Sequence, residues 1–94
     1  MKISVAVLRE AMNKLLEHAE KACGGEIELE EELYWFIQRE DVYDPTKDPT
    51  DISLGCLDDD WGNLEEVAEG KKDAIGYDLV WSASILRALG ERIV

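Results

Sequence analysis

Three consecutive aspartates, Asp58, Asp59 and Asp60, are the residues of this chain whose type and spacing most suggest chemistry. Mg²⁺ and Ca²⁺ prefer carboxylate oxygens, so such a run raises the hypothesis of a cation site. An EF-hand calcium loop, however, needs acids at alternate positions, and adjacent helix positions point about 100° apart. We therefore interpret the run as a helix cap and expect no metal ligand. The alternative is a metal-binding accessory protein or metal-dependent enzyme that uses these aspartates with glutamates 30–32 brought close by folding.

The other reactive side chains do not form a recognisable catalytic pattern. His18 is the single histidine, and no serine, cysteine or second histidine stands at a spacing typical of a triad or a ligand pair. Cys23 and Cys56 are far apart and form no CxxC motif, so we expect two reduced thiols. Glycine-rich phosphate loops and the HExxH and GxSxG motifs are lacking. The sequence therefore predicts a protein that is not an enzyme, with no catalytic residue and no cofactor.

Negative charge is concentrated in the middle of the chain. The 94 residues carry a net charge of −12, and residues 26–60 hold thirteen acids against Arg39 and Lys47. Excess charge of this sign disfavours binding to nucleic acid and to anionic membranes. A localised acidic surface instead suits a basic protein partner, because complementary fields accelerate encounter and suppress wrong pairings. The alternative interpretation is that the acids serve solubility alone.

Aromatic side chains follow the acids directly. An alternating strand over residues 33–37 cannot bury both faces without a second layer, so either Tyr34 and Phe36 or Trp35 and Ile37 should face outward. An exposed aromatic residue beside acids is typical of a protein-binding hot spot, whereas plain core packing is the alternative. The predicted partner-binding residues are Glu30, Glu31, Glu32, Tyr34, Trp35, Asp58 and Asp59.

Three helices should position these residues. Apolar residues at spacings of three and four predict a helix over about 4–23, capped by Ser4 and ended by Gly24. A second helix is expected over 57–69. Its first turn contains the aspartates, whose negative charges interact favourably with the positive end of the helix dipole. The third, over 73–89, should begin at a cap on Asp73 and end at Gly90. It is apolar nearly all round, so it is either a central core helix or the interface of a structural homodimer.

A small β element is expected in residues 26–54. Ile27 and Leu29 alternate with glutamates, and residues 33–37 are rich in aromatic side chains, so both stretches favour strands. Residues 30–32 lack good turn chemistry, so a short helix through 30–38 stays open as an alternative. Residues 41–51 contain two Asp-Pro-Thr repeats and should form a loop, followed by a brief strand at 52–54. The prediction is a single α+β domain over 1–94, mainly helical, with three helices and two or three strands.

Residues 52–61 and 76–90, with Leu33-Tyr34-Trp35 upstream, resemble an uncharacterised family of small acidic bacterial proteins. The resemblance implies a bacterial cytoplasmic origin and brings no activity, cofactor or catalytic residue with it. We also expect a cytoplasmic protein because no apolar run approaches the roughly 20 residues of a spanning helix, and the first apolar stretch is too short for a signal peptide. The leading hypothesis is a non-enzymatic interaction domain that presents an acidic, partly aromatic surface to a protein partner, as an inhibitor or immunity-like protein for a basic toxin or enzyme.

Overall fold

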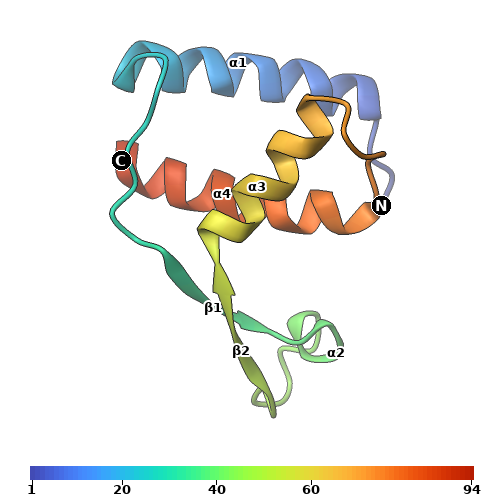
Figure 1. Cartoon of the computed structure of the whole chain (residues 1–94). Helices are drawn as coiled ribbons and strands as arrows, with labels where there is room; N and C mark the ends of the chain where they lie inside the picture. The colour runs from blue at the N-terminus through green and yellow to red at the C-terminus, as the bar shows by residue number, and fades with distance from the viewer. The chain divides into compact units, whose positions relative to one another are not determined.

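The computed structural model describes all 94 residues and confirms the α+β class (Figure 1). In chain order the elements are α1 (Val5–Cys23), β1 (Leu33–Ile37), α2 (Arg39–Val42), β2 (Ile52–Cys56), α3 (Leu57–Ala68) and α4 (Gly76–Ile93). There are thus four helices where three were predicted. The chain divides into two units, residues 1–29 with 87–94 and residues 30–86, which are described separately. None of the helices combines the length and the hydrophobicity needed to cross a membrane.

Helix α1 has the ends that its sequence predicts. The Val7 N–H donates to Oγ of Ser4 over 3.2 Å, and this satisfies one of the free amides of the first turn. Gly24 has φ of 86°, a conformation that favours glycine, and its N–H donates to the Glu20 carbonyl over 2.7 Å. Both ends are therefore fixed by contacts within four residues of the chain.

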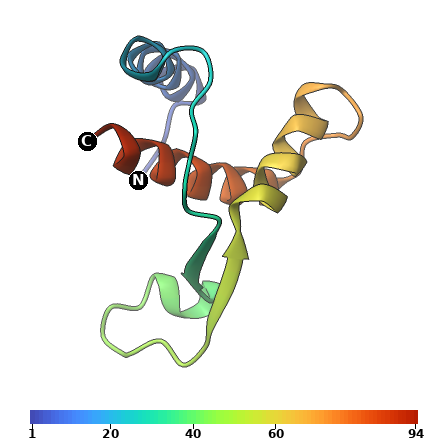
Figure 2. The ribbon, with the colours of Figure 1, turned by 60° about the vertical axis from the view of Figure 1, so that its left-hand side comes forward.

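The sheet is a single antiparallel pair of β1 and β2, which lie side by side in both views (Figures 1 and 2). Its register runs from Leu33 opposite Cys56 to Ile37 opposite Ile52. The aromatic strand is thus confirmed, and the alternative of a helix through 30–38 is wrong. The strand predicted at Ile27 and Leu29 is also wrong, because residues 26–30 are irregular. Without turn residues at 30–32 the aromatic strand pairs with the distant segment that leads into α3.

One glycine is required by this pairing. The Tyr34 ring lies over Gly55, its cross-strand neighbour, so closely that a Cβ at position 55 would overlap the ring. An aromatic ring over a glycine in the opposite strand covers backbone that would otherwise be exposed. The small residue in β2 therefore fits the large residue in β1.

The region predicted as a loop contains the short helix α2. The Asp41 and Val42 amides donate to the Gln38 carbonyl over 2.9 and 3.1 Å, which forms one turn before the first Asp-Pro-Thr repeat. Pro45 then excludes continuation, because the residue before a proline favours extended backbone. The loop prediction thus holds from Asp44 onward and is wrong for residues 41–42.

Helix α3 ends near its predicted position, whereas α4 is shifted along the chain. Gly70, with φ of 74°, follows α3, as expected. Helix α4 begins at Gly76 because the Asp78 carboxylate accepts from the Ile75 N–H over 2.9 Å, as the third residue of a capping box does. Asp73 is therefore not its cap. Gly90 does not end α4 either, since its φ is not positive and the helix continues to Ile93.

A lysine joins α3 to α4 across the turn between them. Nζ of Lys72 contacts Oδ1 of Asp78 at 2.9 Å and Oδ1 of Asn63 at 3.3 Å, and it lies 5.4 Å from the ring centroid of Trp81. The pKa of Asp78 lies below its ordinary value. The largest cause is the hydrogen bond from the Ile75 backbone N–H, and the second is the hydrogen bond from Lys72. The Asp78 carboxylate in the first turn of α4 is therefore bound both by the residue just before the helix, Ile75, and by Lys72 of the turn that follows α3.

Candidate protein-interaction surface

The strand register divides the side chains of the sheet between two faces of different chemistry. Directly paired residues project to the same face, and successive residues alternate. One face carries Leu33, Trp35, Ile37, Ile52, Leu54 and Cys56, and it is called the apolar sheet face below. The other carries Tyr34 and Phe36 opposite Gly55 and Ser53. The hydroxyl groups of the two strands are therefore all on the second face.

The second face is the one that joins the helices. The Tyr34 hydroxyl donates to Oδ2 of Asp60 over 2.6 Å, and the Ser84 hydroxyl donates to the same oxygen over 2.6 Å. Asp60 is buried, so its carboxylate needs these donors. Burial and the hydrogen bond to Asp60 raise the pKa of the Tyr34 phenol above its ordinary value of 10.0, so the phenol stays a donor to a higher pH than a free tyrosine would. This junction of β1, α3 and α4 determines which face of the sheet is left outside.

The apolar sheet face is open to solvent. Trp35 is 71% exposed, Leu33 59% and Leu54 58%. Of the two predicted pairs, Trp35 is the residue that clearly faces outward, while Tyr34 is half-buried by its contact with Asp60. Phe36 and Ile37 are exposed to the same extent, at 38% and 39%. Five of the six side chains of this face are exposed and Cys56 is half-buried, so the face is apolar and largely open to solvent.

Five of the predicted acids border one end of this face. Glu30, Glu31 and Glu32 precede β1, and Asp58 and Asp59 follow β2, where Leu33 pairs with Cys56. The Leu57 N–H donates to the Glu32 carbonyl over 2.7 Å, which continues the pairing beyond the strands. All five side chains are exposed. These residues, called the acidic border below, are brought together by the pairing of two segments that are far apart in the sequence.

The three aspartates do not act together. Asp58, Asp59 and Asp60 all lie in the first turn of α3, as predicted, but Asp60 points to Tyr34 and Ser84 whereas the other two face solvent. No group of three or more His, Cys, Asp or Glu side chains is arranged to hold a metal ion. The first-turn position of the run is consistent with favourable interaction with the helix dipole.

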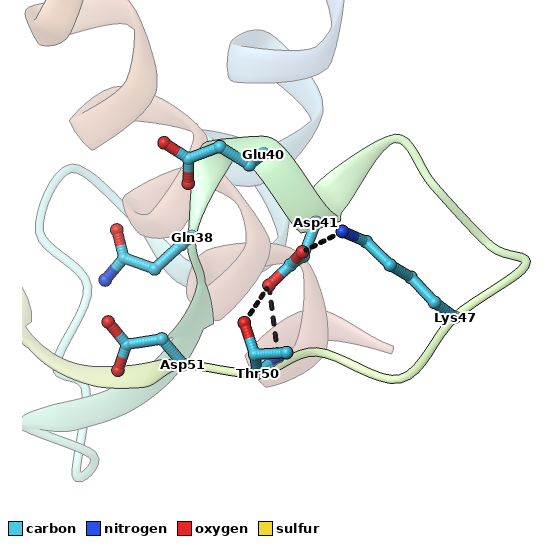
Figure 3. A pocket seen from close by; sticks show the side chains of 6 residues that line it. All are labelled: Gln38, Glu40, Asp41, Lys47, Thr50 and Asp51. Atoms are coloured by element: carbon cyan, nitrogen blue, oxygen red, sulfur yellow. Dashed lines mark hydrogen bonds and ion pairs between the residues drawn. The ribbon is translucent and has the colours of Figure 1, made fainter.

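An open polar pocket of about 500 Å³ lies at the other end of the sheet (Figure 3). Asp41 points toward Thr50 and Lys47 in this view, whereas Gln38, Glu40 and Asp51 extend to the other side. The Asp41 carboxylate accepts from the Thr50 N–H over 3.1 Å and contacts Nζ of Lys47 at 3.2 Å. These contacts, the Thr50 backbone first, lower the pKa of Asp41. The Asp41 carboxylate therefore already binds Thr50 and Lys47 of the loop that follows α2.

Sequence reasoning did not predict that three acids are buried. Asp41, Asp60 and Asp78 are the buried charged residues of the chain, and each has hydrogen-bond donors. Asp60 carried a readable signal, because it stands three residues after Leu57 and four before Leu64, on the apolar side of its helix. An acid on an apolar stripe requires a polar partner from another element.

Comparison of the chain with known protein families, with characterised proteins and with solved structures gives no significant match. The resemblance to small acidic bacterial proteins therefore stays a prediction. Any function must be inferred from the geometry and the electrostatics of this chain alone.

Proposed function

We propose that this chain is a non-enzymatic interaction domain that docks a basic protein partner on the apolar sheet face and its acidic border. The observation that supports this most directly is the outward position of Trp35, at 71% exposure, among five other apolar side chains. Tryptophan is the residue type most enriched in binding hot spots, where a large apolar anchor is buried and surrounded by polar residues. Inhibition of a basic toxin or enzyme, in the manner of an immunity protein, is the role that fits this surface.

The acidic border supplies the selectivity in this proposal. None of its five carboxylates takes part in the ion pairs of the chain, which join other residues. Their charges are thus free to interact with lysines and arginines of a partner. Exposed charges of this kind mainly raise the association rate and exclude acidic competitors, while the apolar centre supplies affinity. Binding should therefore weaken with added salt, mostly through slower association.

The proposal is tested by affinity capture from the native lysate, followed by titration of each purified, captured protein. Trp35→Ala should weaken binding at least about tenfold, as expected for a hot-spot residue. Tyr43→Ala is the matched control, because Tyr43 is an aromatic residue with 88% exposure that lies outside the apolar sheet face. Equal affinity of the two variants for every captured protein would show that the face is not the docking surface.

Charge reversal tests the acidic border separately. Glu30→Lys, Glu31→Lys and Asp58→Lys combined should reduce the association rate and remove most of its salt dependence. Reversal of Glu10, Glu17 and Glu20, exposed acids of α1, changes the net charge by the same amount at a distant point of the sequence. If both triple variants slow association equally, net charge rather than the border attracts the partner.

A further inference from the structure

The backbone of β1 has hydrogen-bonding groups that point away from β2. The Leu57 N–H donates to the Glu32 carbonyl over 2.7 Å, and these two residues stand opposite each other one position beyond the register of the sheet. Hydrogen-bonded and non-hydrogen-bonded pairs alternate along an antiparallel ladder. The N–H and C=O groups of Leu33, Trp35 and Ile37 therefore point outward, to the side of β1 that is opposite to β2.

These outward groups have no backbone partner. The sheet consists of two strands, and none of the three residues makes a backbone hydrogen bond outside it. A strand edge with unpaired N–H and C=O groups is a template for one more strand. The side of β1 formed by the backbone of Leu33, Trp35 and Ile37 is called the β1 edge below. Because the same three side chains belong to the apolar sheet face, an added strand would extend that face.

The β1 edge is more open than the outer edge of β2. Four of the five residues of β1 are exposed, against two of the five residues of β2. Proteins commonly prevent strand addition by placing charged residues or proline in an edge strand. Residues 33–37 contain neither. Of the two edges of this sheet, β1 is therefore the one suited to accept a further strand.

Charge complementarity indicates what kind of strand fits. Glu30, Glu31 and Glu32 directly precede β1 and are exposed, and the ion pairs of the chain join other residues. A strand added in the commoner, antiparallel direction would have its carboxyl end beside these glutamates. Lysines or arginines that follow such a strand would meet three carboxylates. A second copy of this chain would instead bring a further net charge of −12 to the same place.

From these observations we infer that the β1 edge binds an extended, basic segment of the partner as a third, antiparallel strand. The inference rests on the proposed function and names the part of the partner that docks. Directly opposite residues share a face of a sheet, so every second residue of the segment lies beside Leu33, Trp35 or Ile37 and exchanges backbone hydrogen bonds with it. The recognised pattern is thus an alternation of apolar and polar residues followed by basic ones.

A synthetic peptide of alternating valine and threonine that ends in lysines is the probe, titrated into the full chain by calorimetry. The unmodified peptide should bind with its valines on the apolar sheet face. N-methylation of the valine amides removes the donors that face β1 and should weaken binding at least about tenfold. N-methylation of the threonine amides, which face away from β1, is the matched control and should change the affinity by less than about twofold. A peptide with its lysines at the amino end should bind more weakly than the original.

Proline substitution tests the β1 edge from the side of the chain. Leu33→Pro removes one outward N–H at the first position of an edge strand, where proline is tolerated. It should bind the unmodified peptide roughly three- to tenfold more weakly than Leu33→Ala, which loses the same side chain but keeps the N–H. Leu54→Pro and Leu54→Ala are the matched pair on the outer edge of β2, and their affinities should be equal. Circular dichroism checks that all four variants keep their fold.

Equal binding of the two methylated peptides overturns the inference, and so does the absence of binding by every peptide up to about 1 mM. Equal binding by the two peptides that differ in the position of their lysines overturns the antiparallel direction. If a second copy occupied the β1 edge, sedimentation would show a dimer that the peptide does not dissociate, which overturns the inference as well. The proposed function fails separately, when Trp35→Ala binds every captured protein as tightly as Tyr43→Ala does, because that comparison depends on side chains alone.

Discussion

The phenol of Tyr34 donates a 2.6 Å hydrogen bond to the carboxylate of Asp60, 26 residues further along the chain. This contact joins the first strand to the first turn of α3, and Ser84 of α4 donates to the same oxygen. Because side chains alternate along a strand, fixing Tyr34 toward the helices places Trp35 on the opposite side. A partly buried polar contact thus decides that Trp35 is on the outer face of the sheet.

Removal of the Tyr34 hydroxyl should destabilise the fold. Tyr34→Phe leaves Asp60 with one donor fewer, and we expect the free energy of unfolding to fall by about 1 to 2 kcal/mol. Urea unfolding followed by circular dichroism measures the change. Tyr43→Phe serves as the control, since Tyr43 is 88% exposed and should show no effect. Identical unfolding midpoints for both variants would mean that the Tyr34 contact adds nothing to stability.

The glycine under the Tyr34 ring should not tolerate a methyl group. Gly55→Ala introduces a Cβ that overlaps the ring, so we expect a loss of about 1 to 3 kcal/mol, as for other overpacked sites. Gly62→Ala in α3 is the matched substitution, because open space surrounds its Cβ and alanine favours helix by about 1 kcal/mol. The two variants should therefore move the thermal midpoint in opposite directions. A stabilised Gly55→Ala protein would contradict the packing of Tyr34 on β2.

High pH should weaken the same junction. The folded-state pKa of Tyr34 is raised above its ordinary value of 10.0, first by burial and then by its hydrogen bond to Asp60. Below pH 10 the phenol is protonated in both states, so its contribution to stability is fully present. As the pH rises above 10, the unfolded chain releases the proton first, and that contribution is lost progressively up to the folded pKa. Urea midpoints between pH 8 and about 11 should fall less for Tyr34→Phe than for the wild type.

Low pH should act on two other acids. Asp41 and Asp78 have folded-state pKa values below the ordinary value of 3.8, Asp41 through the Thr50 backbone and Lys47, and Asp78 through the Ile75 backbone and Lys72. The unfolded chain therefore binds protons first on acidification, and the stabilisation present above pH 3.8 is lost as the pH falls through the folded values. Thermal melting between pH 6 and about 2 measures this loss. Asp41→Asn and Asp78→Asn should melt at a lower temperature than the wild type at pH 6, and their melting temperature should fall less steeply on acidification. An equally steep fall in the variants would show that these two carboxylates do not cause the acid sensitivity.

The features that the sequence predicts well are those set by neighbours in the chain. Ser4 and Gly24 fix the ends of α1, and Gly70 follows α3, through contacts of a few residues. Pairing between strands is different, because residues 26–30 have a good strand pattern yet no partner, while Ile52–Cys56 take the place beside β1. The choice depends on contacts across the chain that alternation in the sequence does not encode.

The same distinction applies to the interaction surface. Exposure of either Trp35 or Tyr34 follows from alternation alone, but the choice between them required the position of Asp60. The grouping of Glu30, Glu31 and Glu32 with Asp58 and Asp59 likewise depends on the β1–β2 register. Asp60 itself is predictable as a buried acid, since its place on the apolar side of α3 requires a hydrogen-bond donor from another element.

The contacts of Lys72 have a practical consequence for experiments with this protein. Its single ammonium serves Asp78, Asn63 and the ring of Trp81, so acylation by an amine-reactive label would remove the charge that connects the start of α4 to α3. Lys14, on α1, is 74% exposed at its side chain, and its one ion pair is a distant 3.9 Å contact. Conjugation or immobilisation directed at Lys14 would therefore spare the helical turn that amine coupling at Lys72 disrupts.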